Sequence, residues 1–215
     1  IYINFMSIVI LTKFKNEDHI MYEWINHHFE EGIDQIILID DNDNDGYLNK
    51  NKWLNKYIIN EKIIISKSID TKQDIDYTNR LNLIKNHKWL IIIDMDEFIF
   101  SVKKNLKKLL NEELISYEYI KIRWKLFSHR SVFQPKSVIE SNIITHENND
   151  PISKIGIKCI AKTENLKYIH WHYCEFKKNP VNEIMLSAHN QFVQINHYRS
   201  QSDEFLFGVK ELRGG

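Results

Sequence analysis

The chain contains a short and wholly apolar run, Leu90 to Ile93, that passes directly into three acidic residues. A strand without any polar position has both faces buried, and such strands occur in the middle of parallel sheets that helices cover on both sides. These sheets bind their ligands at the carboxyl ends of the strands. The run therefore favours an α/β fold and places Asp94, Asp96 and Glu97 at its functional edge.

Strand-like and helix-like patterns alternate over the first hundred residues. The first helix is expected between an N-cap at Asn16 and a stop at Gly32, because apolar residues recur at helical spacing between them. Three β-α repeats followed by a fourth strand indicate a Rossmann-like, mostly parallel sheet. The expected strands are residues 7–12, 35–39, 62–66 and 89–93, and two further helices are expected at 48–58 and 76–86.

The second half has a different pattern. Residues 120–126 alternate between apolar and polar, which predicts a strand that presents Lys121, Arg123 and Lys125 to solvent. A further strand-like run covers 192–195. No linker or internal repeat separates the halves, and 215 residues with 43% hydrophobic side chains suit one α/β domain. We therefore expect a single domain over 1–215, with halves at 1–100 and 101–215.

Composition excludes several classes of partner. The 29 basic and 29 acidic residues balance, so bulk charge gives no reason to expect nucleic acid or an anionic membrane as the main partner. Cys159 and Cys174 lack the spacing of a zinc site, and the longest apolar runs are far too short to span a bilayer. We expect a cytoplasmic protein, and a luminal one only if an anchor lies outside this sequence.

Asp94 and Asp96 are the strongest candidates for a metal site. If the strand continues through them, both carboxylates leave the same face, roughly 6.6 Å apart, and one hard divalent cation can bridge them. His197 follows the run at 192–195 and could return as a third ligand. The alternative is structural, since acidic residues after a strand are common in loops and helix caps.

A second acidic segment, Asp41 to Gly46, fits the first half of an EF-hand calcium loop. Position twelve is Lys52 instead of the required Glu, and the segment follows a strand instead of a helix, so calcium binding is not favoured. Acidic residues after a second Rossmann-like strand also hold the ribose of a nucleotide. Neither a Gly-x-Gly-x-x-Gly motif nor a P-loop accompanies them, which argues against a dinucleotide dehydrogenase or a P-loop NTPase.

Taken in order, these motifs resemble the glycosyltransferase family 92-like proteins, which are relatives of the family 2 GT-A transferases. The similarity covers nearly the whole chain. Asp43 and Ser128 depart from the relatives, which usually have Ser and Gly there. The matching segments are Lys15 to Glu17, Glu23 to His28, Gly32 to Asp34, Asp40 to Gly46, Trp89 to Phe98, Trp124 to Ser128, and His197 to Phe205 with Lys210, Arg213 and Gly214.

The resemblance implies a GT-A fold with a mixed, acceptor-side second half, a nucleotide-sugar donor that is most simply a UDP-sugar, and a Mn²⁺ or Mg²⁺ ion. The implied metal ligands are Asp94 and Asp96, with His197 as the third. By position, residues for the nucleoside are Asn16, Glu17, Asp40 and Asp41, the residue near the donor phosphates is Arg80, and residues for the diphosphate are Lys154, Lys210 and Arg213.

The resemblance also implies inversion, in which a carboxylate deprotonates the hydroxyl of a glycan, protein or small-molecule acceptor in one displacement. The candidates for this base are Glu97, Asp150 and Glu140, and Trp124 and Trp171 could stack on an acceptor sugar. Two other functions stay open. One is a metal-dependent phosphatase, although that class carries its Asp-x-Asp after the first strand. The other is a non-catalytic, sugar-binding relic of the GT-A fold.

Overall fold

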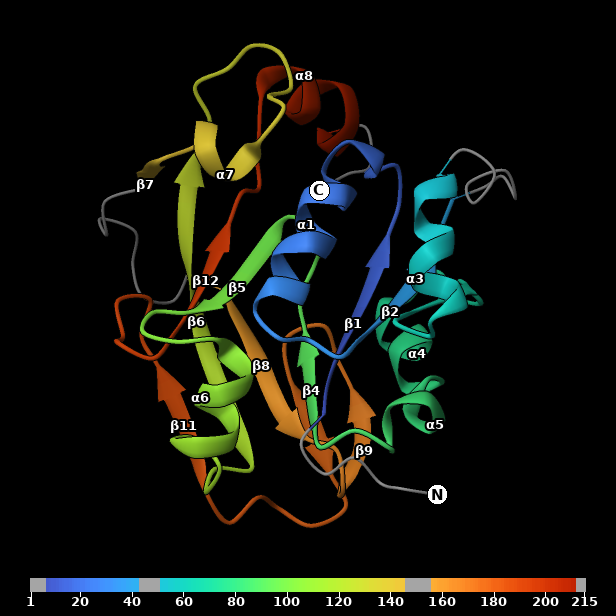
Figure 1. Cartoon of the computed structure of the whole chain (residues 1–215), viewed down its shortest axis with the longest axis vertical. Helices are drawn as coiled ribbons and strands as arrows, with labels where there is room; N and C mark the ends of the chain where they lie inside the picture. The colour runs from blue at the N-terminus through green and yellow to red at the C-terminus, as the bar shows by residue number, and fades with distance from the viewer. Residues whose placement is uncertain (1–6, 43–50, 146–155, 212–215) are drawn as a thin grey trace.

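Residues 7–42, 51–145 and 156–211 are described by this computed structural model of the chain (Figure 1). The first half forms four strands close to the expected positions. β1 pairs in parallel with both β2 and β4, and β2 pairs in parallel with β3, which confirms the predicted parallel sheet. The strands are β1 (Ile8–Phe14), β2 (Gln35–Asp40), β3 (Ile63–Lys67) and β4 (Trp89–Ile92).

The second half continues the same sheet with mixed strand directions, as expected. Its strands are β5 (Glu97–Ser101), β6 (Tyr119–Ser128), β7 (Ile144–Thr145), β8 (Ile157–Lys162), β11 (Glu183–Leu186) and β12 (Val193–His197). The main path runs β3-β2-β1-β4-β8-β6-β12-β5, with β7 and β11 also paired to β6. β9 (Leu166–Ile169) and β10 (Cys174–Phe176) form a separate antiparallel pair.

The helices cover both faces of the sheet. In the view of Figure 1, α1 (Asp18–Glu30) and α6 (Leu106–Glu112) lie on the near face. α4 (Gln73–Thr78) and α5 (Leu81–Ile84) pack with β9 and β10 against the other face. The remaining helical segments are η1 (Lys52–Leu54), α3 (Asn55–Ile59), α7 (Val138–Ser141), α8 (Asp203–Phe205) and the π-helix η3 (Leu206–Lys210).

Two buried cores explain why the β4 run is wholly apolar. Ile91 belongs to the core under α1 and α6, whereas Leu90 and Ile92 belong to the core under α4, β9 and β10. β4 lies between β1 and β8, so both its faces and both its edges are enclosed. The sequence interpretation of this run as a central, doubly covered strand is confirmed.

Several local expectations were wrong. Asn16 is not the N-cap of α1, because it adopts a left-handed φ of 51° and Glu17 occupies the cap position. The helix expected at 76–86 is split into α4 and α5 around Arg80. In β6 Ile120 and Ile122 are buried, as the alternation predicted, but Lys121, Arg123 and Lys125 are only partly exposed. The stop after α1 at Gly32 is confirmed, with a φ of 87° that favours glycine.

Within the described part of the chain, none of the helices is both long and apolar enough to cross a lipid bilayer.

Candidate active site

The acidic residues after β4 lie in a turn. β4 ends at Ile92, and the backbone N–H of Glu97 donates to the carbonyl oxygen of Asp94 at 3.1 Å. The indole N–H of Trp24, from α1, donates to the carbonyl oxygens of both Asp94 (3.2 Å) and Glu97 (2.8 Å). The condition for both carboxylates to leave the same face, a strand that continues through both aspartates, is therefore not met, and the two carboxylates have different surroundings.

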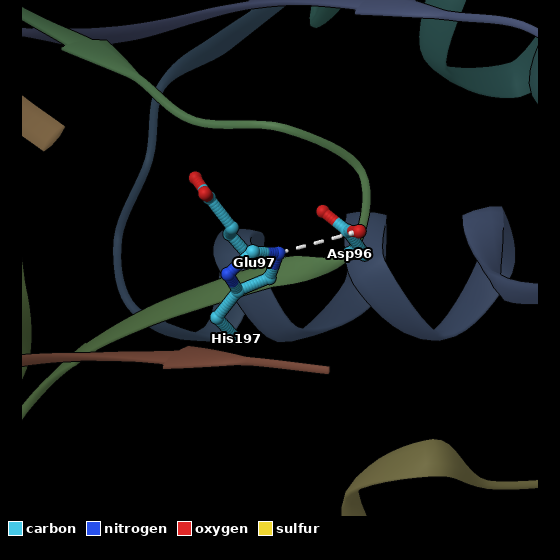
Figure 2. A group of neighbouring side chains, drawn as sticks. All are labelled: Asp96, Glu97 and His197. Atoms are coloured by element: carbon cyan, nitrogen blue, oxygen red, sulfur yellow. Dashed lines mark ion pairs between the residues drawn. The ribbon is translucent and has the colours of Figure 1, made fainter. Parts of the chain in front are cut away.

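Asp96 is buried in this turn and faces β12, the last strand along the chain. Its carboxylate oxygen Oδ2 lies 3.4 Å from Nε2 of His197 (Figure 2). The same oxygen forms an ion pair with Nζ of Lys210, on η3. Burial alone would raise the pKa of Asp96, but His197 and Lys210 outweigh it and hold that pKa well below its usual range. Asp96 is therefore ionised at neutral pH.

The backbone explains how His197 reaches Asp96. β12 pairs antiparallel with β5, and His197 lies directly opposite Glu97 in this ladder. The N–H of Tyr198 then donates to the carbonyl oxygen of Asp96 at 2.9 Å, which extends the pairing past the strand ends. The predicted return of His197 to the acidic motif is thus a consequence of strand register.

Asp94 has a different set of partners. Its Oδ2 accepts a hydrogen bond from Nζ of Lys158, in β8, at 2.6 Å, and its Oδ1 accepts one from Nε2 of Gln73, at the start of α4, at 3.2 Å. The Asp94 side chain remains 35% exposed. The carboxylate is therefore held on both oxygens and still open to the solvent side.

Glu97 is fully buried behind the turn. Its Oε2 accepts from the N–H of Asp94 at 3.0 Å and lies 3.5 Å from Nζ of Lys158. Burial raises the pKa of Glu97 well above its usual range, and Lys158 offsets this only in part. Burial lowers the pKa of Lys158, but Asp94 and Glu97 reverse this effect and raise it above the ordinary lysine value, so the ammonium stays charged.

The described residues include one set of side chains that fits a divalent cation. One ligand atom each from Asp96, Glu97 and His197 lies within 4.8 Å of the others (Figure 2). Glu97 Oε1 and His197 Nδ1 are buried there without any hydrogen-bond partner. Two carboxylates and an imidazole are suitable ligands for Mn²⁺. The structure thus brings together the predicted Asp96 and His197, adds Glu97, and leaves Asp94 beside Lys158.

A pocket of about 630 Å³ opens over this site. The residues predicted for metal, nucleoside or diphosphate that line it are Glu17, Asp41, Asp94, Asp96, His197 and Lys210. Lys13, Lys15 and Arg199 add positive charge to its wall. The pocket therefore combines an acidic centre with basic walls, which is an arrangement suited to a metal-bound phosphate group.

A second pocket of about 310 Å³ lies at the carboxyl ends of β2 and β3. It is lined by Asp40 and Lys67 among others, and it shares Asp41 and Thr71 with the larger pocket. Oδ1 of Asp40 accepts hydrogen bonds from the backbone and side-chain amides of Asn42, at 2.9 and 2.7 Å. The two pockets therefore adjoin, with the acidic end of β2 between them.

Two residues predicted for the donor lie outside both pockets. Asn16 is exposed, and its backbone N–H donates to Oδ1 of Asn42 at 2.8 Å. Arg80 is buried, and its guanidinium donates to the carbonyl and carboxylate oxygens of Asp76, both at 3.1 Å, and to Oγ of Ser66 at 3.3 Å. Arg80 joins α4 to β3, so its position supports a structural role and not contact with donor phosphates.

The described candidates for the catalytic base also lie outside both pockets. Glu97 lines neither pocket, and Glu140 is exposed on α7 away from both. Asp150 lies outside the described residues. The same applies to the diphosphate candidates Lys154 and Arg213 and to most of the calcium-like loop, 43–46.

Aromatic rings from the second half of the chain lie beside His197. The ring of Trp124 is 4.4 Å from that of His197 and 5.5 Å from that of His172, centre to centre. Beyond it, His172 and Tyr173 help to line a third pocket of about 460 Å³. Trp171 instead packs against the core of the far sheet face and stacks on His170. Neither tryptophan lines any of these three pockets, whereas Tyr173 lines the third.

Lys158, Gln73 and Trp24 are the functional contacts that sequence reasoning missed. For Lys158 a signal existed, because it is a lone charged residue within the apolar strand 157–161. Gln73 gave none, since a polar residue at a helix start is ordinary, and Trp24 belongs to a segment that carries the family resemblance, Glu23 to His28, but received no role of its own.

Solved structures with a similar fold include TarS 1–349 from S. aureus, at a TM-score of 0.55 and 15% identity, covering 96% of this chain and 64% of that one. The same TarS fragment in complex with UDP gives 0.55 and 14% identity, covering 88% and 60%. HddC from Yersinia pseudotuberculosis gives 0.50 and 13% identity, covering 96% and 99%. No curated protein matches the chain.

At such low sequence identity, the structural similarity establishes the fold alone. The fold is an α/β, mostly parallel mixed sheet that matches GT-A glycosyltransferase structures. The chain spans slightly less than two thirds of the TarS fragment. Membership of a family rests on the sequence, whose match extends from the middle of β1 past η3. Because the sequence model of Glycosyltransferase family 92 matches residues 11–212, nearly the whole chain, this protein belongs to Glycosyltransferase family 92.

Proposed function

We propose that the protein is a metal-dependent, inverting glycosyltransferase that moves a sugar from a nucleotide-diphospho sugar, most simply a UDP-sugar, to a hydroxyl acceptor. The observation that carries this proposal is the buried Asp96 and His197 pair, which opens with Lys210 onto the 630 Å³ pocket. Family membership supports the reaction class. The TarS complex with UDP supports the choice of nucleotide.

The two adjoining pockets suggest how the donor lies. The nucleoside would occupy the 310 Å³ pocket, where Asp40 and Asp41 offer oxygens to ribose or base. The diphosphate would then reach Lys210 and Arg199 in the larger pocket. A divalent ion held by Asp96 and His197 would neutralise the negative charge that develops on the departing diphosphate. Mn²⁺ suits the imidazole ligand better than Mg²⁺ does.

The acceptor would approach from the second half of the chain. Tyr173 is 43% exposed on the wall of the 460 Å³ pocket, and its ring offers a face for the apolar side of a sugar. His172 Nδ1 donates to the carbonyl oxygen of Ile157 at 2.8 Å, which leaves Nε2 as a hydrogen-bond acceptor for a hydroxyl. Asp150 is retained as the candidate base, because Glu97 and Glu140 do not reach the pockets.

The test is a panel of sugar nucleotides with and without Mn²⁺, followed by thermal shift and by hydrolysis of the donor. We expect UDP to stabilise the protein only with Mn²⁺, and Asp96→Asn to abolish both that stabilisation and donor turnover. Asp203→Asn is the matched control, because Asp203 pairs with His129 and lines neither donor pocket.

The other outcomes separate the rival functions. Stabilisation by UDP without hydrolysis or transfer would indicate a sugar-binding relic. Hydrolysis of aryl phosphates with no response to sugar nucleotides would indicate a phosphatase. No response to any nucleoside diphosphate would overturn the proposal.

A further inference from the structure

Lys158 is a fully buried lysine next to the acidic turn. Its side chain has no exposed surface and projects from β8, a central strand of the sheet. A buried ammonium ion is rare, because its removal from water costs free energy that only close anionic partners offset. Such a residue in the middle of a sheet calls for a specific reason.

The ammonium group of Lys158 contacts two carboxylates of the acidic turn, which would repel each other without a cation between them. Nζ lies 2.6 Å from Asp94 Oδ2 and 3.5 Å from Glu97 Oε2. Glu97 in turn accepts the N–H of Asp94, and Gln73 holds the other oxygen of Asp94. One ammonium group therefore fixes both the carboxylate of Asp94 and that of Glu97, which holds the backbone of Asp94.

Lys158 does not itself contact the space proposed for the donor. It lines neither donor pocket, whereas Asp94 lines the larger one. The acidic motif places three carboxylates in four consecutive residues, and two lysines face them: Lys158 at Asp94 and Glu97, and Lys210 at Asp96. Lys158 therefore contacts Asp94 and Glu97, whereas Lys210 contacts Asp96, so the two lysines meet different carboxylates of the motif.

We propose that Lys158 is a positioning residue that keeps Asp94 out of the metal site and oriented toward the donor pocket. Its fixed charge also offsets the negative charge of Glu97, which belongs to the set of residues that could hold the ion, so it limits how tightly the site binds a divalent cation. This inference rests on the proposed function. Its first consequence concerns Mn²⁺ alone and needs no sugar transfer.

Lys158→Met tests it. Without the ammonium, Asp94 is released and the site becomes more negative, so we expect Mn²⁺ alone to bind about threefold to tenfold more tightly by direct titration. Sugar transfer should slow in the same variant, because Asp94 is no longer oriented. A lysine with a purely structural role would give weaker or unchanged metal binding.

Lys162→Met is the matched control. Lys162 lies on the same strand and over the ring of Trp89, as Lys158 lies over that of Trp124, but its ammonium donates to the carbonyl oxygen of Ile115. It should leave Mn²⁺ affinity unchanged. In a double-mutant cycle with Asp94→Asn, the effect of Lys158→Met should shrink, because the proposed action passes through Asp94.

Lys158→Gln keeps the test decisive if Lys158→Met does not fold. It removes the charge but leaves an amide that can donate to Asp94. We expect Mn²⁺ alone to bind more tightly than in wild type; unchanged or weaker binding would overturn the inference.

The inference and the proposed function fail differently. If both wild type and Lys158→Met bind Mn²⁺ equally, the proposed function stands and the inference is overturned. If only the variant binds Mn²⁺, Lys158 occupies the place of a cation, so the inference holds and the proposed metal dependence fails. If neither binds, both fail.

Discussion

The imidazole Nε2 of His197 lies 3.4 Å from the carboxylate of Asp96, with 8% and 5% of these side chains exposed. Two ligands of one cation can be this close, so the pair is arranged for joint coordination. We expect His197→Gln to weaken Mn²⁺ binding by about tenfold or more, measured by direct titration. The fold should survive, because the substitution keeps a polar side chain of similar size.

His129→Gln is the control for this change, since His129 pairs with Asp203 away from the donor pockets. Equal Mn²⁺ affinity in wild type and His197→Gln would remove His197 from the ligand set.

Lys210 is the basic residue in closest contact with the acidic motif, through its ion pair with Asp96. Because it also lines the larger pocket, it is placed to meet a diphosphate. We expect Lys210→Gln to raise the dissociation constant of UDP, measured with saturating Mn²⁺, by about tenfold, as for loss of a hydrogen bond to a charged group. Lys104→Gln, at a surface ion pair with Glu112, should bind UDP normally.

Gly156 lies directly against the indole of Trp124. A Cβ atom at Gly156 would approach the ring to 1.9 Å, so Gly156→Ala must displace Trp124, which packs on His197. We expect the free energy of unfolding to fall by about 1–3 kcal/mol, measured by urea denaturation, with weaker Mn²⁺ binding. Gly208→Ala meets no atom within 4 Å and should change neither property.

Tyr173 is expected to contribute to acceptor binding only. Tyr173→Ala removes the exposed ring from the 460 Å³ pocket while leaving the donor pockets intact. The KM of the acceptor should rise about fivefold or more, as for loss of one aromatic contact, whereas hydrolysis of the donor in the absence of acceptor should not change. A parallel loss of donor hydrolysis would contradict this assignment.

Stability should depend on pH through His28. Burial, with a smaller contribution from His27, holds the pKa of His28 well below its usual value of 6.5. The unfolded chain therefore takes up a proton at His28 as the pH falls below about 6.5, whereas the folded chain does not. The stability present above that pH is lost as the pH decreases, by up to about 1.4 kcal/mol per pH unit.

The measurement is the free energy of unfolding between pH 7 and 5 for wild type and His28→Gln. The variant should have a flatter slope by about one proton. The exposed His189 provides the control, since His189→Gln should keep the wild-type slope. Equal slopes in wild type and His28→Gln would show that His28 titrates normally.

The sequence predicted the layout of the fold and the meeting of Asp96 with His197. Runs of apolar residues predicted β1 to β4 because these strands lie in the hydrophobic core. His197 ends β12 at the edge of the sheet where β4 also ends, so its side chain lies near the acidic turn. The surroundings of Asp94 could not be predicted, because Lys158 and Gln73 reach it from distant segments through three-dimensional packing. The surroundings of Arg80 could not be predicted for the same reason, since its guanidinium bonds to Asp76 within a buried network.

The turn from Asp94 to Glu97 is also the place where the chain passes from the first half of the sheet to the second. Asp94 is held by Gln73 of α4, from the first half, whereas Asp96 faces His197 of β12, from the second. A donor that contacts both acids therefore cross-links the two halves, and its binding free energy adds to the free energy that opposes their separation. With the donor bound, the parallel first half and the mixed second half should therefore unfold together, in one cooperative transition.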